Sequence, residues 1–326
     1  MRRAAFLTLP FLVPALCVLC VSPLLPSATS PSHRAPDAVP RPKILRISHV
    51  RIRVNDYCKG HDFYSLVLGQ HPDCPPGGLS VTPVGGSMAL WSGQFITLNV
   101  HSFYAPPRNP EDLLEEVGFS TDDAAALHKY LESRNIEVSE VSGPGDRPAT
   151  FVVHDPTGRR IQFIEGNPRP EVDRPQVPPA RQRQIIHAGF IVNDRAAEDH
   201  FFKDILGFHL YWHGGMKDGQ DDWVAMQVPD GTDWVEYMLN ISPTADKHTR
   251  GVMNHIAIGV PDIQAAKAQL IKNGWKPGEE PKIGRDGKWQ LNLYDPDDTR
   301  VEFMEFTPTQ KPCCSEYTGP HPGPKQ

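Results

Sequence analysis

Two histidines and two glutamates stand at equivalent places in two successive β-rich segments in the second half of the chain. They are His187, Glu236, His255 and Glu302. Neutral imidazole nitrogens and anionic carboxylate oxygens together suit a borderline divalent ion and leave positions for water or substrate. Carboxylates gathered without a cation would repel each other and would be costly to bury. We therefore predict that these four residues bind one divalent metal ion: Zn, Ni, Co, Mn or Fe(II).

Side-chain alternation predicts that the four residues share one surface. Successive side chains of a strand point to opposite faces of a sheet. In the expected strand 184–192, alternate residues from Ile186 to Val192 form an apolar face, and His187 lies on the other face. The other three candidates alternate with bulky apolar neighbours in the same way, whereas the competing Glu305 has the parity of the apolar residues. All four candidates are therefore expected to line one concave face, turned away from the helix-covered core.

An internal repeat gives this spacing its meaning. The segment Ile47–Asp56 reappears as Ile185–Asp194, and the segment Asp155–Glu165 reappears as Asp295–Glu305. Self-similarity at so long a period indicates a duplicated module. Each module divides again into two similar halves, so we predict an α+β protein of four βαβββ units. Each pair of units is expected to form a curved, cup-like mixed sheet with helices on its outside.

Composition and the repeat together define the domains. A chain of 326 residues with 39% hydrophobic content suits two ordinary cores, and the proline-rich stretch between the modules indicates a stiff, extended linker. Helices are clearest over 124–134 and 263–273, each behind an aspartate N-cap. The expected segments are a secretory signal or uncleaved anchor at 1–28, a proline-rich linker at 29–43, modules at 44–166 and 184–307, a second proline-rich linker at 167–183 and a Pro/Gly/Cys tail at 308–326.

The N-terminus predicts export. Arg2 and Arg3 precede an uncharged apolar stretch that ends near Pro26, which is the layout of a secretory signal. The stretch is also just long enough to stay as a membrane anchor, although its prolines weaken that alternative. We expect a periplasmic or extracellular protein, which contacts a membrane only if this segment is retained.

The net charge and the cysteine content limit which partners and bonds the chain is expected to have. With a formal net charge of -6, nucleic acid is excluded as an expected partner, and a small-molecule substrate with a monomeric or homodimeric protein is expected. An exported protein can form disulfides. Cys58 and Cys74 could close a small loop, while Cys313 and Cys314 could pair, bind metal or be exposed.

Three motifs of the second module carry a family resemblance. They are Phe201–Phe208 (FFKDILGF), Asn254–Asp262 (NHIAIGVPD) and Asp295–Glu302 (DPDDTRVE). In combination they make residues 45–306 resemble the vicinal oxygen chelate superfamily, which includes glyoxalase (lactoylglutathione lyase), methylmalonyl-CoA epimerase, extradiol dioxygenases and bleomycin-resistance proteins. The resemblance implies that the metal ligands lie in the first and last strand of each unit, where this chain has the four candidates. It also implies that the metal chelates neighbouring substrate oxygens.

The first module serves as an internal control. Its outward face near the first strand carries Arg51 and Arg53, which would repel a cation. We therefore expect this module to be free of metal and to play a supporting role, with anion binding or an internal salt bridge as alternatives. The positions that we align with the four candidates are His49, about Phe95, Glu116 and Gln162.

The reaction stays open at this point. A fourth ligand, Glu236, favours a lyase or isomerase of the glyoxalase type, in which this carboxylate is also a candidate base. His187, His255 and one glutamate would suffice for an Fe(II) extradiol-type dioxygenase. A binding or resistance protein without catalysis is an alternative of another class, and a purely structural metal is a further one. Additional acid or base groups could come from His200, Tyr211, His213, Tyr237 and His248.

Overall fold

The structure is a computed structural model that describes residues 39–70, 74, 85–90, 92–100, 109–143, 148–166 and 183–323. All of them belong to one unit, residues 39–326. The expected signal segment 1–28, most of the linker 29–43 and all but one residue of the linker 167–183 lie outside the described residues. None of the described helices is long and apolar enough to cross a membrane.

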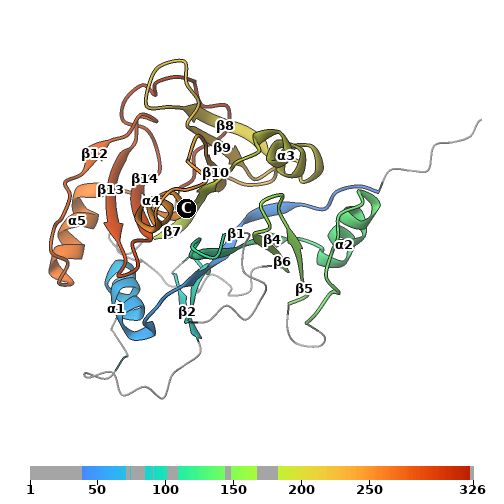
Figure 1. Ribbon diagram of the computed structural model, residues 1–326, viewed down its shortest axis with the longest axis horizontal. Coiled ribbons are helices and arrows are strands. Elements are labelled where there is room, and N and C mark those ends of the chain that lie inside the picture. The colour runs from blue at the N-terminus through green and yellow to red at the C-terminus, as the bar shows by residue number, and fades with distance from the viewer. Residues whose placement is uncertain are drawn as a thin grey trace, which may run out of the picture. The chain divides into compact units, whose positions relative to one another are not determined.

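The first half of the chain forms a mixed sheet of six strands in the order β2-β3-β1-β4-β6-β5 (Figure 1). β1 pairs with β3 in parallel and with β4 in antiparallel orientation. Helix α1 (Tyr57–Leu68) follows β1, and helix α2 (Ala124–Ser133) follows β4. The strands are β1 (Ile44–Arg53), β2 (Gly85–Ala89), β3 (Phe95–Asn99), β4 (Leu114–Thr121), β5 (Thr150–His154) and β6 (Arg160–Glu165).

The second half forms a sheet of eight strands in the order β12-β13-β14-β11-β7-β10-β9-β8. In Figure 1 this sheet runs from β12 and β13 at the left, past β14 and β7, to β8 at the upper middle. Its strands are β7 (Gln184–Ile191), β8 (His209–Gly214), β9 (Trp223–Gln227), β10 (Trp234–Met238), β11 (His255–Val260), β12 (Lys282–Ile283), β13 (Trp289–Tyr294) and β14 (Arg300–Glu305).

The helices of the second half follow the same plan. Helix α3 (Arg195–Asp199) continues into the π-helical turn η2 (His200–Ile205) after β7, and α5 (Ile263–Lys272) follows β11. A further helix, α4 (Lys247–Met253), precedes β11. The Asp262 side chain accepts a hydrogen bond from the Ala265 amide, so the predicted N-cap of α5 is present. The predicted α+β fold with two tandem modules and curved mixed sheets is confirmed.

One apolar core runs through both modules. It includes Phe119 of β4 and Phe208 after η2, whose rings meet edge to face with centroids 5.4 Å apart. Polar groups also join the modules: the Gln94 side-chain amide bonds both the N–H and the carbonyl of Ile185, at 2.8 and 2.7 Å. The first module therefore supports the first strand of the second sheet directly.

A β-bulge corrects the predicted parity of β7. His187 pairs with Ala257 on β11, but the next pair is Ile185 with Ile258, so Ile186 is the extra residue. Ile185 consequently packs in the main core, and Ile186 joins a separate cluster with Tyr211 and other residues on the opposite face. The expectation that Ile186 faces the helix-covered core was wrong, because strict alternation fails at a bulge.

Candidate metal centre

Four neighbouring strands in the middle of the second sheet carry the four candidate ligands. His187 lies on β7, Glu236 on β10, His255 on β11 and Glu302 on β14. In the sheet these strands are adjacent, in the order β14-β11-β7-β10. Ala257 of β11 pairs with His187 on one side and with Glu302 on the other. Residues that are far apart in the sequence are thus brought together by strand register.

The four side chains converge. The two imidazoles approach through their Nε2 atoms, 3.1 Å apart. Glu236 Oε2 lies 3.3 Å from His255 Nε2 and 3.9 Å from His187 Nε2, and Glu302 Oε2 lies 3.6 Å from His187 Nε2. Two ligand atoms at about 2.1 Å from one ion are separated by about 3.0 to 3.4 Å. The separations between the two imidazoles and between Glu236 and His255 fall in this range, and the distances from His187 to Glu236 and to Glu302 exceed it. His187, Glu236 and His255 form the tightest group.

Close packing positions the His255 ring. Its Nδ1 lies 3.1 Å from the Met253 carbonyl, so this nitrogen carries the hydrogen and Nε2 keeps its lone pair toward the cluster. A methyl group on Gly189 would lie 2.0 Å from His255 Cε1, so only glycine leaves room for the ring. His187 Nδ1, in contrast, is buried without a hydrogen-bond partner among the described residues.

Burial sets the protonation of the cluster. Both histidines are fully buried, and burial is the main cause that lowers the pKa of His187 and of His255 well below the ordinary value. Burial also raises the pKa of Glu302 to about 7, with the charges of Glu236 and Asp286 acting in the same direction and Arg300 opposing them. The imidazoles are therefore neutral, with lone pairs available to a cation.

This donor set fits a divalent ion. Two neutral imidazoles point their nitrogens at each other, and two carboxylates join them without any cationic side chain in the described residues within ion-pair distance of either. A cation between them would relieve the repulsion of the carboxylates and use both lone pairs. Two imidazoles and two carboxylates match Zn, Ni, Co, Mn or Fe(II) better than Mg or Ca.

The centre opens into a cavity of about 350 Å³ with two different walls. Glu236 and Glu302 reach this cavity, and the two histidines lie buried beneath it. Strands β8 to β10 supply an aromatic wall, and the β12 to β14 end of the sheet supplies a polar wall. The aromatic wall contains Tyr211, Trp212, Trp223 and Trp234; the polar wall contains Lys282, Arg285, Gln290, Asn292 and Arg300.

Comparison with known families decides the relationship of the second module. Residues 184–303 match the model of the Glyoxalase/Bleomycin resistance protein/Dioxygenase superfamily. The second module belongs to this superfamily. A search of curated proteins found no match. The superfamily was expected from the motifs, and this expectation is confirmed.

Solved structures extend the likeness across most of the chain. Homoprotocatechuate 2,3-dioxygenase from Arthrobacter globiformis is 17% identical, with a TM-score of 0.58 over 82% of this chain and 81% of that chain. The Brevibacterium fuscum enzyme, in a mutant form, is 18% identical, with a TM-score of 0.59 over 87% and 75%. The 2,3-dioxygenase LapB from Pseudomonas sp. KL28 is 18% identical, with a TM-score of 0.58 over 87% and 96%. At these identities the likeness establishes a shared two-module fold.

In the first module, strand register corrects one predicted equivalence. Gly189 pairs with Glu236 and with His255, and its counterpart Arg51 pairs with Thr97 and with Glu116. The counterpart of Glu236 is therefore Thr97. Phe95 was the wrong choice, since it pairs with His49 as Trp234 pairs with His187. Pairing with the neighbouring strand, which the spacing along the chain does not contain, fixes this equivalence.

The corresponding position of the first module holds an internal ion cluster. The buried Glu116 carboxylate lies 3.2 Å from His49 Nε2 and accepts hydrogen bonds from Arg51 and Arg160 at 3.1 and 2.9 Å. Burial alone would raise the pKa of Glu116, but these three neighbours lower it to about 2. Guanidinium groups therefore supply the positive charge in this module, and the internal salt bridge is the alternative that the structure supports.

The C-terminal tail contributes to the aromatic wall, which the sequence did not predict. The Tyr317 ring lies 4.8 Å from the Tyr211 ring and lines the cavity, and its hydroxyl donates to the Asp286 carbonyl at 2.8 Å. Behind this wall the Lys288 ammonium is fully buried, 4.6 Å from the centre of the Trp234 ring. Burial lowers the pKa of Lys288 to about 8. No core pattern in the tail sequence signals these contacts.

The five additional acid or base candidates differ in whether they line the cavity. Tyr211 lines the cavity, while Tyr237 packs in the main core. His200, His213 and His248 pair with nearby aspartates away from the cavity. Glu305, the competitor of Glu302, accepts a hydrogen bond from the Ile263 amide at the start of α5. Tyr211 alone among these six reaches the cavity.

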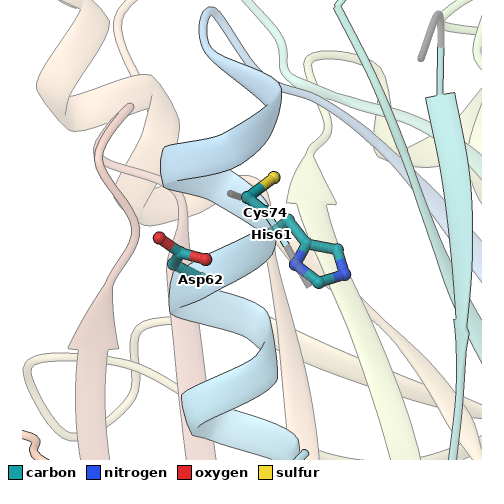
Figure 2. A group of neighbouring side chains, drawn as sticks. All are labelled: His61, Asp62 and Cys74. Atoms are coloured by element: carbon teal, nitrogen blue, oxygen red, sulfur yellow. The ribbon is translucent and has the colours of Figure 1, made fainter. Parts of the chain in front are cut away.

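Two further groups of ligand-type residues contain cysteines that are already bonded. Figure 2 shows His61 and Asp62 on helix α1 with Cys74 next to them. Cys74 forms a disulfide with Cys58, so its sulfur is not a thiolate. In the other group, Asp218 lies beside Cys313 and Cys314, which are bonded to each other. Because these cysteines form disulfides, neither group offers a thiolate ligand.

Proposed function

We propose that the protein is a metal-dependent enzyme of the extradiol type, which uses Fe(II) and O₂ to open the ring of an aromatic vicinal diol. The observation that carries this proposal is the convergence of His187 Nε2, His255 Nε2 and two carboxylates beneath an aromatic-walled cavity. The fold shared with 2,3-dioxygenases supports it. Both atoms of O₂ enter the ring-opened product, so the reaction needs no external reductant.

The roles follow from exposure and residue type. His187, His255 and Glu302 would hold the ion as two imidazoles and one carboxylate, the set found in non-haem iron oxygenases. When bound, the ion supplies Lewis acidity to two neighbouring substrate oxygens. The Glu236 side chain is 14% exposed, against 5% for Glu302, so Glu236 is the carboxylate better placed to accept a proton from a diol hydroxyl.

The aromatic wall would hold the substrate ring. Trp212, Trp223 and Trp234 line the cavity together with Tyr211. Offset or edge-to-face contacts between aromatic rings add about 0.5–1.5 kcal/mol each beyond buried area. A cavity of about 350 Å³ lies at the lower end of the range for small-molecule sites and admits a single substituted ring.

Metal analysis with oxygen uptake tests the proposal. The purified protein should contain one iron per chain and consume O₂ with catechols, while His187→Ala and His255→Ala should lose both properties. His200→Ala is the matched control, because His200 is an exposed histidine on η2 that pairs with Asp204. If both ligand variants kept stoichiometric metal, the site assignment would fail.

A lyase or isomerase is the second candidate, and Glu236 is the observation that favours it. Its Oε2 lies 3.3 Å from His255 Nε2, close enough to act as a fourth ligand as well as a base. Zinc, nickel or cobalt in the purified protein, without O₂ uptake, would favour this reaction. Ligand binding without any turnover would favour a binding or resistance protein.

We also propose that the protein acts outside the cytoplasm. The Cys58–Cys74 and Cys313–Cys314 disulfides support this proposal, since such bonds persist in oxidising compartments. Cell fractionation of the full-length chain, together with N-terminal sequencing of the mature protein, tests both export and cleavage of the signal.

A further inference from the structure

Arg300 of β14 is a cation that lines the cavity. Arg300, Glu302 and Met304 alternate along the strand, and all three line the cavity. The Arg300 Nε is buried and has no hydrogen-bond partner in the part of the chain that the structure describes. Among the residues that the structure describes, no carboxylate lies within ion-pair distance of its guanidinium. The other cations of this wall are engaged: Arg285 pairs with Asp218, and Lys282 lies 3.9 Å from Glu279.

The first module shows what an arginine at the position of Arg300 can bind. Gly118 pairs with Gln162 as Ala257 pairs with Glu302, so Arg160, two residues before Gln162, is the counterpart of Arg300. Arg160 donates from its Nε to the Glu116 carboxylate at 2.9 Å. In the second module His255 takes the place of Glu116. The same Nε that binds a carboxylate in the first module is therefore the one that has no partner in the second.

A neighbouring polar atom is also unused. Asn292 of β13 pairs directly with Glu302, so its side chain lies on the same face. Asn292 Oδ1 is buried and finds no hydrogen-bond partner among the described residues, while its Nδ2 donates to Glu279 at 3.2 Å. Buried polar atoms without partners are rare in proteins, and each calls for an explanation such as an ion, an ordered water or a functional role. Within the described ranges, one donor and one acceptor on the polar wall beside Glu302 are thus without a hydrogen-bond partner.

We propose that Arg300 binds a carboxylate of the substrate, which makes the substrate an aromatic vicinal diol with an anionic substituent. This inference rests on the proposed function, since it takes the cavity as the substrate site. The chelating oxygens would lie over the centre, the ring against the β8 to β10 wall, and the carboxylate against Arg300. Asn292 Oδ1 would accept a hydrogen bond from a hydroxyl group of the same ligand.

The local charge favours such a substrate. A bound divalent ion would offset the charges of Glu236 and Glu302, and the buried Lys288 faces the buried Asp286. Arg300, whose charge acts on Glu302 in the metal-free protein, then has no carboxylate within ion-pair distance among the described residues. Hydrogen bonds between charged groups are worth enough to give about a 10- to 100-fold preference for an anionic ligand over a neutral one of the same shape.

Binding of matched probes to the metal-loaded protein tests this proposal. The probes are 3,4-dihydroxybenzoate and its neutral isostere 3,4-dihydroxybenzamide, titrated without oxygen while the tryptophan fluorescence of the cavity wall is followed. The protein should bind the benzoate about 10 to 100 times more tightly. Arg300→Gln should reduce this ratio to about 3 or less and leave the Kd of the amide unchanged, and Arg300→Lys should retain part of the ratio.

Controls separate this outcome from misfolding and from failure of the proposed function. Lys272→Gln, an exposed lysine of α5, should keep the full ratio, and metal content and thermal unfolding are measured for every variant. Equal binding of both probes by the wild type, no binding of either, or an unchanged ratio in Arg300→Gln would overturn the inference. A charge preference without ring opening would contradict the extradiol reaction and leave the carboxylate site standing. Ring opening of both probes at equal kcat/KM would support the extradiol reaction and contradict the carboxylate site.

Discussion

The substitution Glu302→Gln is expected to stabilise the metal-free protein and to weaken metal binding. Glu302 is 4% exposed, and burial raises the pKa of its carboxyl from 4.5 to about 7. The folded chain therefore holds this proton more tightly than the unfolded chain does. Stability from this group is complete below about pH 4.5 and is lost as the pH rises to about 7.

The size of the change in unfolding free energy follows from the pKa shift of Glu302. Each pKa unit corresponds to about 1.4 kcal/mol, so at pH 8 the ionised carboxylate costs the metal-free fold about 3 kcal/mol. At pH 5 the cost is below about 1 kcal/mol by the same relation. A glutamine of nearly the same shape carries no charge and avoids this cost, while it removes one anionic ligand from the ion.

Urea denaturation of the chelator-treated protein measures how much Glu302→Gln stabilises the metal-free fold. At pH 8 the free energy of unfolding of Glu302→Gln should exceed that of the wild type by up to about 3 kcal/mol, and at pH 5 the two should nearly coincide. Added metal should stabilise the wild type more than the variant. The control is Glu280→Gln, because Glu280 is an exposed glutamate that pairs with Lys267.

Equal stabilities of the two metal-free proteins at pH 8 would refute this reasoning. That result would mean that the Glu302 carboxylate is already balanced without a metal ion. A variant less stable than the wild type at both pH values would point to a structural hydrogen bond instead of an uncompensated charge.

Three other substitutions test separate features. Glu116→Gln should destabilise the protein by about 3 kcal/mol at pH 7 and by much less at pH 3, as measured by urea denaturation. The reason is that a carboxyl group whose pKa is lowered to about 2 contributes stability that is lost as the pH falls from 4.5 through about 2. An equal loss of stability at both pH values would contradict the ion cluster. Gly189→Ala should displace the His255 ring and lower the metal content of a protein that still unfolds cooperatively, as checked by elemental analysis and calorimetry. Tyr64→Phe should cost about 1 kcal/mol, since it removes the hydrogen bond to Asp295 of the other module, and an unchanged denaturation midpoint would show that this bond adds nothing.

Local sequence patterns determined the modules and most of the ligand strands. The repeat of Ile47–Asp56 at Ile185–Asp194 defined the duplication, and Asp262 marked the start of α5, because caps and strand periodicity depend on neighbours within a few residues. The alternation of His255 and Glu302 with core residues was also a local property. These patterns were enough to place four ligand-type side chains on one face.

The tertiary structure decided what depends on partners distant in the sequence. The bulge at Ile186 and the register that matches Glu236 with Thr97 arise from pairing between strands, which alternation within one strand does not contain. The same holds for Tyr317, whose tail reaches the cavity only through contacts with other strands. Arg300 was visible in the sequence two residues before Glu302, on the same face. That its Nε has no partner in the described part of the chain became meaningful only when the fold showed Arg160 bound to a carboxylate at the equivalent position.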